Sequence, residues 1–181
     1  GGLLLSMNPR PDGTFDKGQE NLLLGIGVWL KQNGEAIYGT RPWEIYGEGH
    51  LEDLFYTQEN PQNGAKSRAI QPDTNLFNSE DIRFTVKNNT LYATVLGIPS
   101  NGKVLIKSLS TDVEVSPENE IESIELIGHG KIDFNRTKTG VQIILPKELP
   151  NNVALVFKVK TKGMLEQRKN TGSNAIVPKK T

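Results

Sequence analysis

The second half of the sequence consists of short apolar runs at regular spacing, separated by residues that favour turns. Residues 82–86 alternate apolar and polar side chains, and Asn88-Asn89 is typical of a hairpin turn. Further runs of the same kind lie at 91–96, 104–109, 121–127, 132–134, 141–145 and 153–159. About seven short strands at this spacing predict an antiparallel β-sandwich of Greek-key type, so the chain is expected to be mainly β.

The N-terminal part follows a different pattern. Residues 3–7 form a short apolar run that fits a buried strand, and Asp16 with Gln19 resembles a capping box at a helix start. The helix is predicted to end near Gln32, and its apolar face is formed by Leu22, Leu23, Ile26, Trp29 and Leu30. Gly25 and Gly27 are expected to pack closely against a neighbouring strand. A strand, a turn and a helix in this order predict the last unit of a (β/α) barrel.

The two parts are joined by sequence without a clear period. From Arg41 to Glu80, proline and glycine interrupt polar sequence that contains four aromatic residues, Trp43, Tyr46, Phe55 and Tyr56. We expect an irregular connection whose aromatic residues seal the contact between helix and sandwich, while a sugar-stacking platform is the alternative. The predicted divisions are therefore a barrel remnant (1–45), a connection (46–80), a sandwich (81–161) and a polar tail (162–181).

Composition excludes several classes of protein. The 181 residues carry 21 basic and 21 acidic side chains, and zero net charge argues against a dedicated nucleic-acid or anionic-membrane binder. No apolar run approaches the roughly 20 residues needed to span a bilayer. The chain has no cysteine, so disulfides and thiolate metal sites are excluded. This composition fits a cytosolic or a periplasmic enzyme, and a periplasmic or secreted bacterial protein is our expectation.

The residues that could carry catalysis or bind a metal have simpler structural interpretations. Asp12 lies in a Pro-Asp-Gly turn, and Glu35 follows the helix end, at the stability face of a barrel. His50 and His129 are far apart in sequence, whereas a zinc site needs three or four ligands at characteristic spacing. We therefore predict no catalytic residue, no metal site and no cofactor within this chain.

Two segments of the N-terminal part resemble a known enzyme family. Residues 1–19 contain Gly-Gly-Leu-Leu-Leu-Ser, a loop with prolines and Asp-Gly, and a helix start with glutamine. Residues 29–43 contain Asn-Gly-Glu-Ala-Ile-Tyr-Gly-Thr-Arg-Pro-Trp. Both resemble the closing segments of the catalytic domain of α-L-fucosidases, glycoside hydrolase family 29. Residues 83–85, 90–93, 103–109 and 121–128 resemble the β-sandwich domain that follows it in that family.

The resemblance implies that the chain is the C-terminal part of a retaining hydrolase that removes terminal α-L-fucose from glycans. The catalytic carboxylates would precede Gly1, so this part alone is expected to be inactive and to serve as an accessory domain. Ser6, Met7 and Asn8, at the end of the expected barrel strand, are the candidates for lining a sugar pocket. The exposed strand-helix segment is expected to pack on the sandwich or on another copy of the chain. A carbohydrate-binding module and a structural or adhesion domain are the alternatives.

Overall fold

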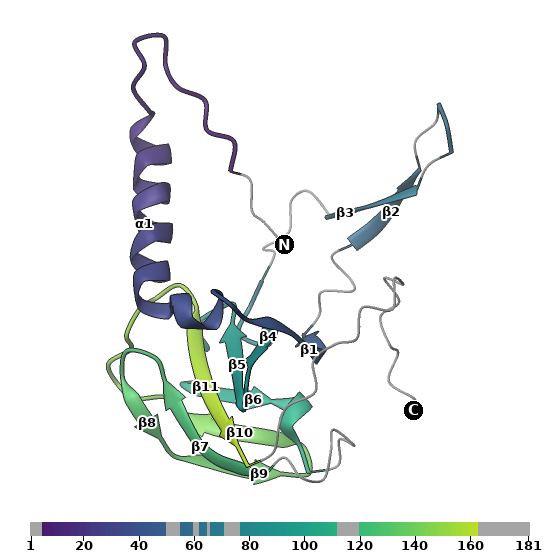
Figure 1. The fold of residues 1–181 in the computed structure, drawn as a ribbon, viewed down its shortest axis with the longest axis vertical. Coiled ribbons are helices and arrows are strands. Elements are labelled where there is room, and N and C mark those ends of the chain that lie inside the picture. The colour runs from purple at the N-terminus through teal and green to yellow at the C-terminus, as the bar shows by residue number, and fades with distance from the viewer. Residues whose placement is uncertain are drawn as a thin grey trace.

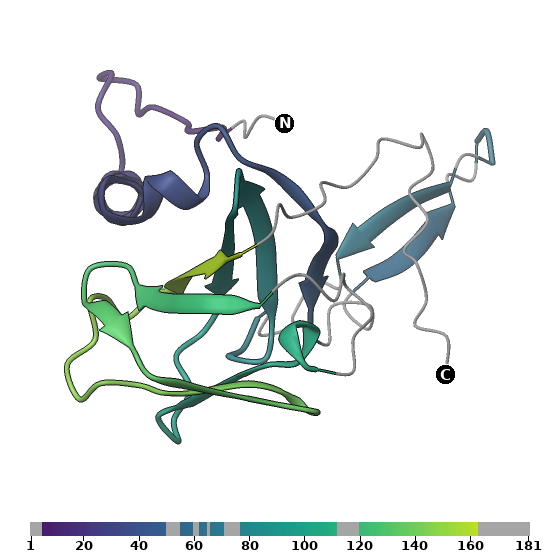
Figure 2. The same ribbon diagram turned by 60° about the horizontal axis from the view of Figure 1, so that its bottom comes forward.

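The chain folds into two layers of strands with a helix on one side. A computed structural model describes residues 5–49, 55–59, 62–64, 66–70, 77–111 and 120–162. Figure 1 shows one long helix, α1, rising from the strands, and a two-stranded hairpin that projects on the other side. In Figure 2 the same helix is seen almost end-on and apart from the strands.

The larger sheet contains six antiparallel strands in the order β1-β4-β5-β11-β7-β8. The C-terminal strand β11 therefore lies between β5 and β7, which are far from it in sequence. The strands are β1 (Arg41–Glu48), β4 (Ile82–Lys87), β5 (Thr90–Val95), β7 (Ile121–Leu126), β8 (Gly130–Ile132) and β11 (Leu155–Thr161).

The smaller sheet contains three antiparallel strands in the order β6-β10-β9. These are β6 (Lys103–Ile106), β9 (Phe134–Thr137) and β10 (Gly140–Ile144), and a short 3-10 helix, η3 (Lys107–Leu109), follows β6. The apolar run predicted at 132–134 is divided between β8 and β9, because the chain passes from one sheet to the other at Asp133. The hairpin seen apart from the sandwich in Figure 1 is formed by β2 (Phe55–Glu59) and β3 (Lys66–Ile70).

The core lies between the two sheets and is built from alternate residues of their strands. In β4, for example, Ile82, Phe84 and Val86 are buried, while Arg83 and Thr85 point to the other face. The smaller sheet contributes Val104, Ile106, Val141 and Ile143 to the same cluster. The alternation in the sequence thus identifies the buried face, and the predicted antiparallel sandwich is confirmed.

The segment predicted to be irregular contains regular structure. Residues 41–48 form β1, which pairs with β4 at the edge of the larger sheet, and 55–59 and 66–70 form the hairpin β2–β3. The expectation was wrong because Pro42 was read as a break, although an edge strand tolerates a residue without an N–H group. The register of β1 shifts between Pro42 and Gly47, which removes the simple alternation from the sequence.

Helix α1 (Lys17–Asn33) is close to the prediction, but the described part of the strand expected before it, residues 5–7, is not a strand. Residues 5–7 have no regular secondary structure, and residues 3 and 4 lie outside the described part of the chain. A strand needs a neighbour for its ladder, and no described strand pairs with this segment. A Cβ atom added at Gly25 or Gly27 would meet no described atom within 4 Å, so their predicted close packing is wrong for this structure.

Because these two glycines lie in an open stretch of α1, alanine should stabilise the helix at both positions. We expect Gly25→Ala and Gly27→Ala each to raise the free energy of opening α1 by about 1 kcal/mol, measured by amide hydrogen exchange. Gly140→Ala, in β10, is the control, and it should lower the free energy of unfolding of the protein. Gly140 has a φ of 148°, and its Cβ would lie 2.6 Å from the Ile106 carbonyl oxygen. Weaker protection of α1 in the two helix variants would contradict the prediction.

Candidate functional site

The three residues predicted to line a sugar pocket lie in the irregular segment that precedes α1. Ser6 and Asn8 are exposed, and Met7 is half-buried. Nothing in the described structure encloses these side chains in a binding pocket. Their role in substrate contact therefore stays a prediction.

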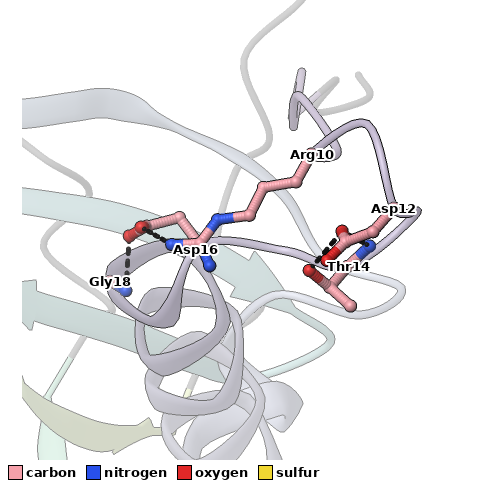
Figure 3. A network of polar contacts seen from close by, with 5 residues as sticks. All are labelled: Arg10, Asp12, Thr14, Asp16 and Gly18. Atoms are coloured by element: carbon pink, nitrogen blue, oxygen red, sulfur yellow. Dashed lines mark hydrogen bonds and ion pairs between the residues drawn. The ribbon is translucent and has the colours of Figure 1, made fainter.

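The turn between this segment and α1 is held by local hydrogen bonds, shown in Figure 3. One carboxylate oxygen of Asp12 accepts hydrogen bonds from the Thr14 backbone N–H, at 3.0 Å, and from the Thr14 hydroxyl, at 2.7 Å. These bonds favour the ionised form and lower the pKa of Asp12. Asp12 has the local structural role that the sequence predicts for it.

The start of α1 is fixed by Asp16, whose carboxylate accepts a hydrogen bond from the Gly18 N–H at 2.8 Å. Arg10 donates to the other oxygen of the same carboxylate at 2.7 Å (Figure 3). Both contacts lower the pKa of Asp16. The capping box is formed only in part, because the Oε1 atom of Gln19 is buried without a hydrogen-bond partner. The turn and the helix start therefore form one ordered unit.

The other end of α1 meets the larger sheet through a polar junction. The short 3-10 helix η1 (Gly34–Ala36) follows α1 directly and carries Glu35. One oxygen of this carboxylate, Oε2, accepts hydrogen bonds from the Tyr92 hydroxyl at 3.0 Å and from the Lys158 ammonium at 2.7 Å. Glu35 is thus bound to the sandwich, and its predicted structural role agrees with these contacts.

Glu35 and Tyr92 shift each other's pKa. Partial burial pushes the pKa of Glu35 upward, but the hydrogen bonds from Lys158 and Tyr92 outweigh it, so the pKa lies below its usual value. Burial, together with the hydrogen bond to Glu35, raises the pKa of Tyr92 to about 12. The pair is therefore a carboxylate and a neutral phenol over most of the pH range, which suits a structural contact better than proton transfer.

Apolar and backbone contacts surround this polar junction. Trp29 packs against Ala36, Tyr92, Ile127 and Val156, and its indole N–H donates to the Ala154 carbonyl at 3.0 Å. The Thr85 hydroxyl donates to the Ala36 carbonyl at 2.7 Å. The C-terminal end of α1 is therefore attached to the sandwich by side chains from several strands.

The rest of α1 leaves apolar side chains in solvent. Leu22, Leu24 and Val28 are 58%, 61% and 72% exposed. At about 100° per residue, Leu24 and Val28 lie opposite to the centre of the predicted apolar face, which consists of Leu22, Leu23, Ile26, Trp29 and Leu30. The sequence prediction of one apolar face missed this second side, although residues 22–30 contain no polar side chain. A helix that is apolar on opposite sides needs cover on both.

The remaining candidates from the sequence have no clear role in binding. Trp43 is 1% exposed and packs edge-on against Phe84, with ring centroids 5.3 Å apart, so it seals the core and cannot stack on a sugar. His129 lies in an exposed turn. His50 and the side chains of Phe55 and Tyr56 lie outside the part that the structure describes. Within that part, no group of three or more His, Cys, Asp or Glu residues is placed to hold a metal ion.

Among the described residues, no helix is both long and apolar enough to cross a membrane.

Comparison with known proteins assigns the sandwich to a domain family. Residues 72–160 match the family described as the alpha-L-fucosidase C-terminal domain. Tissue alpha-L-fucosidase of Mus musculus is 32% identical over 159 residues, which cover 87% of this chain and 27% of the mouse protein. Plasma alpha-L-fucosidase of Homo sapiens is 41% identical over 59 residues, or 33% of this chain and 13% of the human protein.

Solved structures show the same relationship. The crystal structure of Thermotoga maritima alpha-fucosidase in complex with a mechanism-based inhibitor matches with a TM-score of 0.57 and 27% identity, covering 87% of this chain and 30% of that protein. A second crystal structure of that enzyme, in complex with fucose, gives a TM-score of 0.55 at 28% identity, with 86% and 30% coverage. The chain thus spans less than a third of the length of these relatives.

The raised pKa of Tyr92 leads to a testable pH dependence. The folded protein holds the phenol proton up to about pH 12, whereas an unfolded tyrosine loses it near pH 10. The contribution of Tyr92 to stability is therefore complete below pH 10 and is lost as the pH rises from 10 to 12. We expect Tyr92→Phe to lower the free energy of unfolding at pH 7 by about 1.5 kcal/mol and to flatten this alkaline loss.

Urea unfolding followed by fluorescence between pH 7 and pH 12 measures both effects. The difference between wild type and Tyr92→Phe removes the contribution of the other tyrosines and lysines. A Tyr92→Phe variant with the same alkaline loss as wild type would show that Tyr92 does not cause it.

Proposed function

Since the chain carries the C-terminal domain of the α-L-fucosidase family, we propose that it is the accessory C-terminal part of a glycoside hydrolase that removes terminal α-L-fucose from glycans. The match over residues 72–160 carries this proposal. It is supported by relatives named as α-L-fucosidases whose similarity to this chain includes α1 as well as the sandwich.

The chemistry of the proposed reaction would belong to other parts of the enzyme. A retaining glycosidase needs a nucleophilic carboxylate and an acid/base carboxyl group about 5–5.5 Å apart. Asp12 is bound to Thr14, and Glu35 is bound to Tyr92 and Lys158. We therefore infer that the chain alone is inactive and that it supports the catalytic domain.

Helix α1 would provide the connection between the two parts. Its C-terminal end is attached to the sandwich, and its exposed apolar residues require cover. In the proposed enzyme the catalytic barrel covers them, and residues 5–9 continue from the helix start toward the substrate. Among these residues we propose Ser6, Met7 and Asn8 for contact with the sugar.

The isolated chain should neither hydrolyse fucosides nor bind fucose. We expect no release of nitrophenol from an aryl α-L-fucoside above the buffer rate, because the two carboxyl groups that the reaction requires are proposed to belong to other parts of the enzyme. NMR titration with L-fucose and a fucosylated oligosaccharide should leave the amide shifts unchanged. Turnover would contradict the inactive part of the proposal. Saturable binding to the strands would instead support the carbohydrate-binding module.

The role of α1 can be tested in a chimera that joins this chain to the catalytic part of the Thermotoga maritima enzyme in place of the matching segment. We expect the chimera to hydrolyse an aryl α-L-fucoside. The pair of changes Leu24→Lys and Val28→Lys should reduce that activity at least tenfold, because charged side chains cannot be buried at low cost.

The same two changes should leave the thermal midpoint of the isolated chain nearly unchanged, because both positions are exposed there. The matched control is Ile144→Lys, on an exposed position of the sandwich that is 73% exposed. Full activity of the doubly substituted chimera would show that this side of α1 is not covered. Sedimentation of the isolated chain before and after the changes also tests whether the segment mediates self-association.

A further inference from the structure

Three neighbouring strands of the larger sheet present a row of polar side chains to η1. Thr85 on β4 is the register partner of Tyr92 on β5, and Tyr92 is the register partner of Lys158 on β11. The row therefore runs straight across the sheet, on the face opposite to the core. All three side chains bind η1: Thr85 binds the Ala36 carbonyl, while Tyr92 and Lys158 bind Oε2 of Glu35.

The position of Glu35 after α1 calls for a positive charge close to its carboxylate. The C-terminal end of a helix carries partial negative charge, so a carboxylate immediately after α1 is placed unfavourably. Lys158 offsets this with a direct ion pair, in which its side chain is only 23% exposed. Lys87, on the neighbouring strand β4, adds a further attraction to Glu35. Without these cations, a negative charge would face the negative end of the helix, and the junction would be destabilised.

The remaining length of α1 receives little support from the sandwich. Figure 1 shows the helix extending away from the strands, with only its C-terminal end close to them. Leu22, Leu24 and Val28, in the middle of α1, are more than half exposed. The direction of the helix must therefore be set at its C-terminal end, by the row, by Trp29 and by the contacts of Gln32 with Asn151.

We propose that Thr85, Tyr92 and Lys158 form a clamp on η1 that sets the direction of α1 relative to the sandwich, with Tyr92 and Lys158 as positioning residues. The helix has 17 residues and is therefore about 25 Å long. A rotation of about 10° at the clamp would displace its N-terminal end by roughly 4 Å.

The consequence for catalysis rests on the proposed function. The N-terminal end of α1 is joined through the Asp12 and Asp16 turn to residues 5–9, which are proposed to approach the sugar. A displacement of 1 Å can lower an enzymatic rate by about 100-fold. The clamp would thus allow the sandwich to control the geometry of a site that it does not itself touch.

The absence of cysteine in the chain permits a direct measurement of the helix direction. Asn21→Cys on α1 and Gln142→Cys on β10 are both exposed positions, and each accepts a spin label. Double electron–electron resonance then gives the distribution of distances between the helix and the sandwich. We expect a narrow distribution in the doubly labelled chain with an intact clamp.

Breaking the clamp should broaden this distribution. In Tyr92→Phe and Lys158→Met we expect additional populations displaced by roughly 4 Å or more. Glu35→Ala, which removes the acceptor of the clamp, should broaden the distribution in the same way. Glu35→Gln keeps an acceptor for Tyr92, so it should retain more of the narrow population than Glu35→Ala. The matched control is Lys162→Met, which removes an exposed ion pair with Glu120, away from the clamp, and should leave the distribution narrow.

The two tryptophans separate loss of the clamp from loss of the fold. The indole N–H signal of Trp43 reports the buried core, and that of Trp29 reports the attachment of α1. The clamp is supported if the distribution broadens and the Trp29 signal shifts while the Trp43 signal is unchanged. An unchanged narrow distribution in the Glu35→Ala, Tyr92→Phe and Lys158→Met variants overturns it. Because the measurement uses this chain alone, its outcome is independent of whether the longer protein hydrolyses fucosides.

Discussion

The insertion of β11 between β5 and β7 is the constraint on which the rest of the structure depends. Its inward residues Leu155, Phe157 and Val159 are fully buried and join the core built by both sheets. Its outward residue Lys158 binds Glu35, and the Ala154 carbonyl just before it accepts the Trp29 indole N–H. One strand therefore completes the core and also holds the helix, because consecutive side chains of a strand point to opposite faces.

The sandwich was predictable from the sequence because its strands obey a local rule. In β4 the alternation of apolar and polar residues follows burial directly, and in β10 it does so from Val141 to Ile143. Strand β1 was not predicted, since Pro42 and Gly47 interrupt its pattern and only its place at the sheet edge makes them acceptable. The start of α1 was recognised from Asp16, which acts through neighbours in sequence, and the predicted end near Gln32 is one residue from the observed end.

The polar junction could not be predicted in the same way. Tyr92 and Lys158 lie 57 and 123 residues along the chain from Glu35, whose carboxylate they both bind. Their proximity depends on the register of β11 against β5, which the sequence does not reveal. The second apolar side of α1 was predictable, because residues 22–30 are all apolar residues or glycine. The prediction used the spacing of Leu22, Ile26 and Trp29, which defines one face only.

The chain consists of a sandwich with its own core and a helix whose apolar side chains are only partly covered. The sandwich buries large side chains such as Trp43, Phe84 and Phe157 between its own sheets, so its packing needs no other domain. Helix α1 has the reverse property, since the energy of burying Leu24 and Val28 is available only from a partner. The proposed clamp links the two, because the sandwich would set the direction in which the helix meets its partner. The sandwich would then contribute to catalysis through the position of a helix and not through a side chain at the substrate.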